Sequence, residues 1–179
     1  MRENEGSGAA SLNGNPVSSV LFVCLGNICR SPLAEGVFRA VLEERGFTGM
    51  TVDSAGTGSW HAGEQPDRRS IAIAAHHGVD ISGQRARKVI AEDFSRFDLI
   101  LGMDRSNVAD LKALAPAEGR GKVHRFLEFA RQGARDVPDP YYDGPDAFAA
   151  VYRMVREASE ALAARLVRDP ENRNRFRLD

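Results

Sequence analysis

The chain has 179 residues, of which 42% are hydrophobic and 27% are charged, and its formal net charge is −1. These values are typical of one globular domain with a sizeable core. The near-zero net charge excludes a chain that nucleic acid or anionic lipid attracts as a whole. We therefore expect neither nucleic acid nor a membrane as a partner.

The location of the protein is indicated by its apolar segments and its cysteines. No apolar run approaches the ~20 residues that span a bilayer, and residues 1–16 lack the apolar core of a signal peptide. Both cysteines, Cys24 and Cys29, lie in one loop, which argues for a reducing compartment and against a disulfide scaffold. We expect a cytoplasmic protein.

Three segments are predicted along the chain. Residues 1–16 are polar and rich in Gly, Ser and Asn, so we expect a disordered N-terminal extension. Residues 17–168 carry the periodic patterns of a single domain, and residues 169–179 form a basic C-terminal tail. Its three arginines indicate a frayed end more than a nucleic-acid contact.

The domain begins with an apolar run, Val20 to Val23, that is typical of a buried strand. A short loop follows, and apolar residues then recur at helical spacing over residues 33–42. Ser31 is predicted to cap this helix, and Pro32 suits its first turn.

Strand and helix patterns then alternate to the end of the domain. Further strands are expected over residues 50–53, 97–103 and 123–126, with helices over 67–78, from Asp104 to Pro116, and along a face that runs from Phe148 to Leu166. This alternation predicts an α/β fold, a single doubly wound domain whose central, mostly parallel four-stranded sheet is flanked by helices. Phosphate ligands of such folds lie beyond the carboxyl ends of the strands, where the loop after the first strand lies.

That loop is a predicted anion cradle. Backbone N–H groups at a helix start point inward, and we expect phosphate contacts from its members Leu25, Gly26, Asn27, Ile28 and Cys29. Arg30 has a planar fork that suits two phosphate oxygens. The same positive field favours a thiolate at Cys24, which is a nucleophile for phosphoryl transfer. The simpler alternative is a Gly-containing turn with two buried cysteines.

The pattern Cys-x5-Arg-Ser, together with Gly26, Asn27, Cys29 and Pro32, resembles the low-molecular-weight protein tyrosine phosphatase family. Asp-Pro-Tyr-Tyr at residues 139–142 is the second half of this resemblance. It implies hydrolysis of phosphotyrosine and aryl phosphates through a phosphocysteine. Cys24 would be the nucleophile, Arg30 would bind phosphate, and Asp139 would act as general acid and then base.

The resemblance also implies supporting roles around this loop. Ser31 would donate a hydrogen bond to the Cys24 sulfur, and Ser54 would bond the loop residue Asn27. Trp60, Tyr141, Tyr142 and Leu25 would wall a deep aromatic slot that accepts phosphotyrosine. Trp60 could instead anchor its loop to the surface, and the two tyrosines could instead pack under the last helix.

The acid assignment has competitors at this stage. Asp136 and Asp143 lie near Asp139 in the same Pro-rich loop, and an Asp before Pro is also a common turn former. No cofactor and no metal is expected. His76 and His77 face different ways on a helix, and no further Cys/His cluster is present.

Two residues raise separate questions. In relatives the cysteine that matches Cys29 forms a reversible disulfide with the nucleophile, although Cys29 could simply pack as a small apolar residue. Gln84 stands where the family often carries a His tied into the hydrogen bonds of the loop. Because Gln carries no charge, we expect that part of the network to differ here.

Other functions remain as alternatives. Arsenate reductases share the loop but need a downstream pair of cysteines, and this chain has none beyond Cys29. An inactive phosphate-binding module is a second alternative. Ile28 favours phosphotyrosine, since related phosphoarginine phosphatases tend to have Thr there. The expected partner is a phosphotyrosine protein, such as a bacterial tyrosine kinase or a host protein, with inorganic phosphate as product, and the enzyme is expected to be a monomer.

Overall fold

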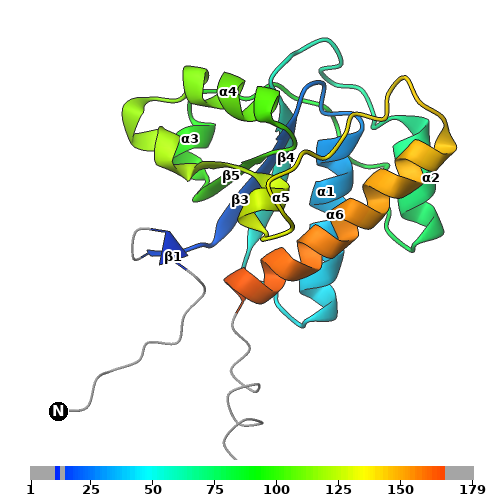
Figure 1. Ribbon diagram of the computed structural model, residues 1–179, viewed down its shortest axis with the longest axis horizontal. Helices are drawn as coiled ribbons and strands as arrows, with labels where there is room; N and C mark the ends of the chain where they lie inside the picture. Colours follow the sequence, from blue (N-terminus) through cyan, green and yellow to red (C-terminus); the bar gives the residue numbers. More distant parts are fainter. Residues whose placement is uncertain (1–10, 13–14, 168–179) are drawn as a thin grey trace, which may run out of the picture.

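The computed structural model describes residues 11–12 and 15–167, and its centre is a four-stranded sheet (Figure 1). The strands are β3 (Ser19–Cys24), β4 (Thr51–Gly56), β5 (Leu99–Gly102) and β6 (Val123–Arg125). They pair in the order β4-β3-β5-β6, and every pair is parallel. The predicted doubly wound α/β fold with four strands is therefore confirmed.

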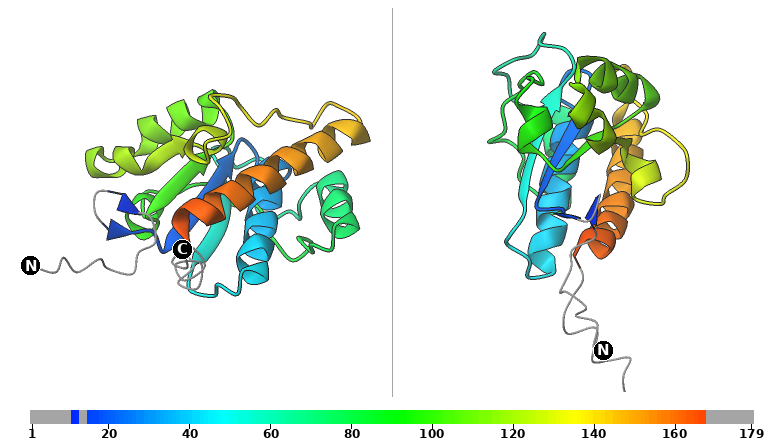
Figure 2. Two further views of the ribbon diagram at one scale, coloured as in Figure 1. Left: turned by 60° about the horizontal axis from the view of Figure 1, so that its bottom comes forward. Right: turned by 90° about the vertical axis from the view of Figure 1, so that its left-hand side faces the viewer.

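The two faces of the sheet are covered by different helices (Figures 1 and 2). One face packs against α1 (Arg30–Glu44), α5 (Phe126–Phe129) and α6 (Pro145–Leu166), with α2 (Arg68–His76) beside them. The other face packs against α3 (Asp93–Arg96) and α4 (Arg105–Leu114). The 3-10 turn η1 (Ala117–Lys122) connects α4 to β6. None of the described helices combines the length and apolar character needed to span a bilayer.

Successive side chains of β3 point to opposite faces of the sheet, and this explains why the strand is central. Val20 and Phe22 point into the core beneath α1 and α6, whereas Leu21 and Val23 point into the core beneath α3 and α4. All of them are fully buried, so the strand carries apolar side chains on both faces. Pairing with β4 ends at Cys24↔Gly56, which places the loop after β3 at the carboxyl edge of the sheet.

The start of α1 differs from the prediction. The helix begins at Arg30, its N-cap is Cys29, and no side chain caps it. Ser31 lies inside the first turn and is fully buried, so its prediction as the cap is wrong. The physical reason is that its hydroxyl contacts the sulfur of Cys24 instead of a backbone N–H of its own helix. Pro32 does lie in the first turn, as predicted.

The two ends of the chain lie largely outside the described residues. Before the domain, β1 (Ser11–Leu12) and β2 (Asn15–Pro16) pair as a short antiparallel ribbon. The disordered extension expected over residues 1–16 is otherwise outside the described part of the chain, as is the tail over 169–179. The predicted boundaries at 17 and 168 stay predictions.

Candidate active site

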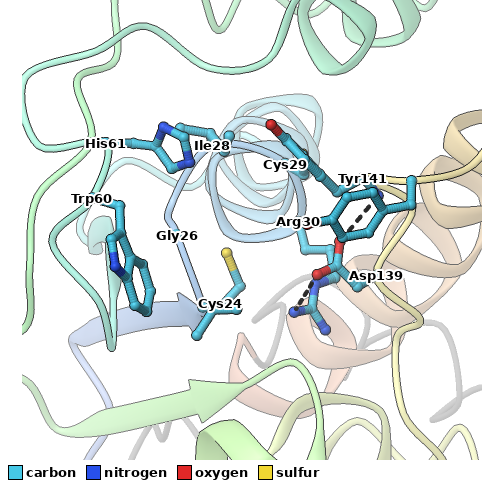
Figure 3. A pocket seen from close by; sticks show the side chains of 11 residues that line it. Cys24, Gly26, Ile28, Cys29, Arg30, Trp60, His61, Asp139 and Tyr141 are labelled. Atoms are coloured by element: carbon cyan, nitrogen blue, oxygen red, sulfur yellow. Dashed lines mark hydrogen bonds and ion pairs between the residues drawn. The ribbon is translucent and has the colours of Figure 1, made fainter.

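A pocket of about 280 Å³ opens beyond the carboxyl end of β3 (Figure 3). Three segments line it: the loop after β3, the loop after β4, and the loop before α6. The lining residues are Cys24, Leu25, Gly26, Ile28, Cys29, Arg30, Trp60, His61, Asp139, Tyr141 and Tyr142. Nearly all of the predicted site residues are therefore together, while Asn27, Ser31 and Ser54 lie buried behind the loop. His61 was not predicted.

The loop depends on the backbone of Asn27, which has φ +55° in the left-handed region that non-Gly residues rarely adopt. Its side chain fixes this conformation from three sides. Its Oδ1 accepts a hydrogen bond from the Arg87 N–H at 3.0 Å. Its Nδ2 donates to the hydroxyls of Ser31 at 2.8 Å and Ser54 at 3.0 Å. These partners come from α1, β4 and the segment after α2, so the loop shape is set by the whole domain.

The end of β4 holds the other side of the loop. The backbone N–H groups of Thr57 and Gly58 donate to the carbonyls of Cys24 and Leu25 at 3.0 and 2.9 Å. Gly56 allows this approach, because a Cβ there would lie 2.8 Å from the Leu25 carbonyl oxygen. We infer that only glycine fits at this position.

Cys24 is buried, and its sulfur points into the pocket between Trp60 on one side and Arg30 and Asp139 on the other (Figure 3). The Ser31 Oγ lies 3.0 Å from the Cys24 Sγ, close enough for a hydrogen bond to sulfur. The sulfur is therefore reached by a ligand only from the pocket side.

Arg30 joins the loop to two other segments. Its Nη1 donates to Asp104 Oδ2 at 2.6 Å and to the Val137 carbonyl at 3.0 Å, and its Nη2 lies 3.7 Å from Asp139 Oδ2. Burial alone lowers the pKa of Arg30, but the charges of Cys24 and Asp104 raise it above its ordinary value. The guanidinium is thus held charged and oriented at the pocket wall.

Asp104 is a site residue that the sequence analysis identified only as a helix start. It is the N-cap of α4 and forms a capping box with Asn107, while its second carboxylate oxygen accepts from Arg30. A polar residue directly after β5, the neighbour of β3, lies at the same sheet edge as the loop. That position in the chain was the signal that could have identified it.

The three acids of the loop before α6 are placed differently. Asp139 lines the pocket, and its Oδ1 accepts from the Tyr141 N–H at 3.1 Å. The Asp136 carboxylate accepts from Arg125 at 3.0 Å and does not line the pocket. Asp143 is exposed and does not line the pocket either. The geometry therefore favours Asp139 among the three.

Arg69 anchors the far end of this loop, a contact that sequence reasoning missed. Its guanidinium donates to the carbonyls of Tyr141 at 2.9 Å and Asp143 at 3.0 Å. It also pairs with Asp67 at 3.0 Å and lies 4.3 Å from the centre of the Phe148 ring. The start of α2 and the start of α6 are thereby tied to the residues just after Asp139.

The aromatic residues form an exposed rim around the pocket. Tyr142 is 95% exposed and Trp60 71% exposed, while Tyr141 packs edge-on against Tyr142 with ring centres 4.9 Å apart. Packing of both tyrosines under the last helix is therefore wrong for this structure. Their side chains and that of Leu25 are available to a ligand that enters the pocket.

Comparisons with known proteins agree with this geometry. A family model described as low molecular weight phosphotyrosine protein phosphatase matches residues 19–172. The chain belongs to this family. The low molecular weight phosphotyrosine protein phosphatase of Schizosaccharomyces pombe is 44% identical over 79% of this chain and 92% of that relative. A low molecular weight protein-tyrosine-phosphatase of Streptomyces coelicolor is 43% identical over 86% of this chain and 96% of that relative.

Solved structures give the same result. A protein tyrosine phosphatase from Entamoeba histolytica with Hepes in its active site is 37% identical, has a TM-score of 0.79, and covers 83% of this chain and 96% of its own. Wzb from Vibrio vulnificus in complex with benzylphosphonate is 34% identical, has a TM-score of 0.75, and covers 84% of this chain and 99% of its own. The predicted family and enzyme class, a protein tyrosine phosphatase, are confirmed.

Both cysteines of this phosphatase are free thiols in the structure. Burial, with the nearby charge of Asp67, raises the pKa of Cys29 to about 12, so this side chain is a neutral thiol at physiological pH. A reversible Cys24–Cys29 disulfide stays a prediction. Within the described part of the chain, no group of three or more His, Cys, Asp or Glu residues is arranged to hold a metal ion.

Glu35 extends the hydrogen bonds behind the loop and was not predicted. Its Oε1 accepts from the Ser54 hydroxyl at 2.9 Å, and Ser54 in turn accepts from Asn27. A chain of hydrogen bonds thus runs from the Glu35 carboxyl to the neighbourhood of the Cys24 sulfur. Burial raises the pKa of Glu35 to about 7, although Arg39 Nε lies 3.4 Å from its other oxygen.

Gln84 does not join this chain. Its amide donates to the Pro32 carbonyl at 3.0 Å, in the first turn of α1. Its buried Oε1 has no hydrogen-bond partner among the described residues. The Gln84 side chain therefore contacts the first turn of α1 and is not part of the hydrogen bonds around Asn27, and a difference from the family pattern stays a prediction.

The raised pKa makes stability depend on pH in a defined direction. A carboxyl whose pKa is higher in the folded chain favours folding below its unfolded pKa, and this contribution is lost as pH rises through about 7. Glu35→Gln should remove the dependence. Between pH 5 and 8, the free energy of unfolding of the native chain should fall by roughly 2–3 kcal/mol more than that of the variant. Urea unfolding followed by circular dichroism at each pH measures this, and parallel pH curves would contradict it.

Proposed function

We propose that this phosphatase hydrolyses phosphotyrosine and other aryl phosphate monoesters at the pocket of Cys24, through a phosphocysteine intermediate. The observation that carries the proposal is the position of the Cys24 sulfur in a pocket that Arg30 and Asp139 also line. A nucleophile, an anion binder and an acid on one small pocket are the parts that phosphoryl transfer requires.

In the first step the backbone amides of the loop and Arg30 bind the phosphoryl oxygens. Cys24 attacks phosphorus, the S–P bond forms, and the bond from phosphorus to the aryl oxygen breaks. Asp139 donates its proton to the departing aryl oxygen, which leaves as a phenol. The fixed amides and Arg30 meet the charge on the equatorial oxygens and supply most of the stabilisation.

In the second step Asp139, now a carboxylate, takes a proton from water as the water oxygen attacks phosphorus. The S–P bond breaks, inorganic phosphate leaves, and the thiolate of Cys24 returns. The contact of 3.0 Å between Ser31 Oγ and the sulfur supports a hydrogen bond that stabilises this leaving thiolate. The cycle balances with water as the only co-reactant and needs no cofactor.

The rim supports selection of an aromatic phosphate ester. Trp60, Tyr141 and Tyr142 stand around the opening, where a flat phenyl ring can contact them while its phosphate reaches the loop. Benzylphosphonate, a phosphonate with an aromatic ring, is bound by the related Wzb of Vibrio vulnificus. We extend the same substrate class to this chain, as Ile28 in the loop also favours.

The proposed setting is the cytoplasm, with the enzyme as a monomer. Its physiological substrate would be a phosphotyrosine protein, either a bacterial tyrosine kinase or a host protein. A sedimentation coefficient that does not change with protein concentration would support the monomer.

Removal of the nucleophile gives the first kinetic prediction. Native protein should hydrolyse p-nitrophenyl phosphate with reductant and chelator present, and Cys24→Ser should abolish turnover because the hydroxyl is a far weaker nucleophile. The measurement is release of p-nitrophenol, with circular dichroism to verify that the variant folds. Absence of turnover in the native protein would favour the inactive phosphate-binding module.

The acid assignment predicts a change in the pH profile. With phenyl phosphate, whose leaving group needs a proton, Asp139→Asn should lower kcat by ~10²–10⁴ and flatten the alkaline limb. Asp143→Asn is the matched control in the same loop and should keep the native profile. An unchanged profile in Asp139→Asn would move the acid role to Asp136 or Asp143.

The anchor of the acid loop gives a third prediction. Arg69→Gln removes the hydrogen bonds to two loop carbonyls, so Asp139 should be held less well and kcat for phenyl phosphate should fall on the order of tenfold. The fall for p-nitrophenyl phosphate should be smaller, since that leaving group departs without a proton. Arg68→Gln, at the exposed neighbouring position, is the control. Equal losses for both substrates would show that Arg69 does not act through the acid.

A further inference from the structure

A second hollow, of about 600 Å³, lies along β6, the last strand of the sheet. It is enclosed by α4, β6, α5, the segment after α5, and the final turns of α6. We call it the basic pocket, and its lining residues are Arg105, Val108, Lys112, Val123, His124, Arg125, Glu128, Phe129, Ala134 and Arg165. None of these residues lines the active pocket.

The charge of this lining is strongly unbalanced. Four of its residues are Arg or Lys, one is His, and Glu128 is the only acid in it. The whole chain, by contrast, has a formal net charge of −1. Positive charge is therefore gathered at this hollow from segments that are far apart in the sequence, and a composition average does not reveal it.

Most of this charge has no acidic partner in the described part of the chain. Arg105, Lys112 and Arg165 form no ion pair with described residues. The guanidinium of Arg165 lies over the Phe129 ring at 4.0 Å, and its Nη1 donates to the Phe129 carbonyl, which leaves its other N–H groups without a described partner. A face-on ring contact compensates a cation only partly. These three side chains are thus available to a negatively charged ligand.

Arg125 is the buried member of the set, at 7% exposure. Its two Nη atoms bind Asp136 at 3.0 Å and Glu128 at 3.1 Å. Its Nε is buried and has no hydrogen-bond partner among the described residues. A buried guanidinium N–H without an acceptor is costly, so Arg125 is held at this place by its two carboxylate partners.

The pKa values of two basic groups in the pocket, His124 and Arg165, are lowered. Burial lowers the pKa of His124, and the charges of Lys112 and Arg165 lower it further. Burial also lowers the pKa of Arg165, with Arg131 acting in the same direction. Burial is the larger cause of both shifts, and the neighbouring cations act in the same direction.

The shape of the pocket narrows the class of ligand. Guanidinium forks match phosphate oxygens, and the three cations without an acidic partner, on α4 and α6, carry more charge than one phosphate group neutralises. Val108, Val123 and Phe129 provide apolar surface beside them. A hollow of this volume falls in the usual range of ~300–1,000 Å³ for small-molecule sites. We propose that the basic pocket binds a small organic ligand that carries two or more phosphate groups.

The proposal is tested by calorimetry with α,β-methylene-ADP, which the phosphatase reaction does not cleave between its phosphorus atoms. The native chain, with its active pocket intact, is compared with Lys112→Gln/Arg165→Gln. We expect the native chain to bind the probe at two kinds of site, and the double variant to lose at least about tenfold in affinity at one of them. Turnover of p-nitrophenyl phosphate should stay at the native level.

The controls separate this site from the active pocket and from general charge. Lys88→Gln/Arg153→Gln removes the same charge at exposed positions outside the basic pocket and should bind like the native chain. Lys112→Glu, a single exposed change, should weaken the same site if the double variant folds poorly. Methylenebisphosphonate in place of the nucleotide measures how much of the affinity comes from the two phosphorus groups alone, without the nucleoside. Identical isotherms for native chain and pocket variants would overturn the proposal.

Discussion

The active pocket depends on one guanidinium. Arg30 begins α1, yet it binds the N-cap of α4 through Asp104 and the backbone of the loop before α6 through Val137. Val137 is itself fixed to the end of β5, because its N–H donates to the Met103 carbonyl at 2.8 Å. A buried charge with these partners holds three segments in register, and removal of the Asp104 carboxylate would take away its closest counter-charge.

The fold could be predicted from the sequence because the apolar residues that build its core recur with the periods of strands and helices. Val20 to Val23 are apolar on both faces of a central strand, and Phe148, Val151 and Val155 mark one face of the final helix. The residues that we propose to carry the chemistry could be predicted for another reason. Cys24 to Ser31 lie in one continuous motif, so a local pattern contains most of the proposed phosphate-binding loop.

The contacts that hold this motif in place could not be predicted from the sequence, because they join segments that are far apart in the chain. Nothing near Glu35 in the sequence indicates that it receives a hydrogen bond from Ser54, and nothing near Arg69 indicates the carbonyls of Tyr141 and Asp143. Ser31 shows the opposite error. Local rules favour it as a helix cap, but tertiary partners use its hydroxyl. The basic pocket was missed for the same reason, as its residues come from four elements.

The close approach at Gly56 has a consequence for how this enzyme can change. The floor of the pocket is built from backbone groups at van der Waals contact, and a single added carbon at Gly56 would push the loop out of shape. The rim is less constrained by packing, since Trp60 and Tyr142 are mostly exposed and contribute little to the core. Under the proposed mechanism, reaction and recognition therefore reside in separate layers of the molecule. Drift in the outer layer can redirect the enzyme to new phosphoproteins while the inner layer, and the rate it supports, stay as they are.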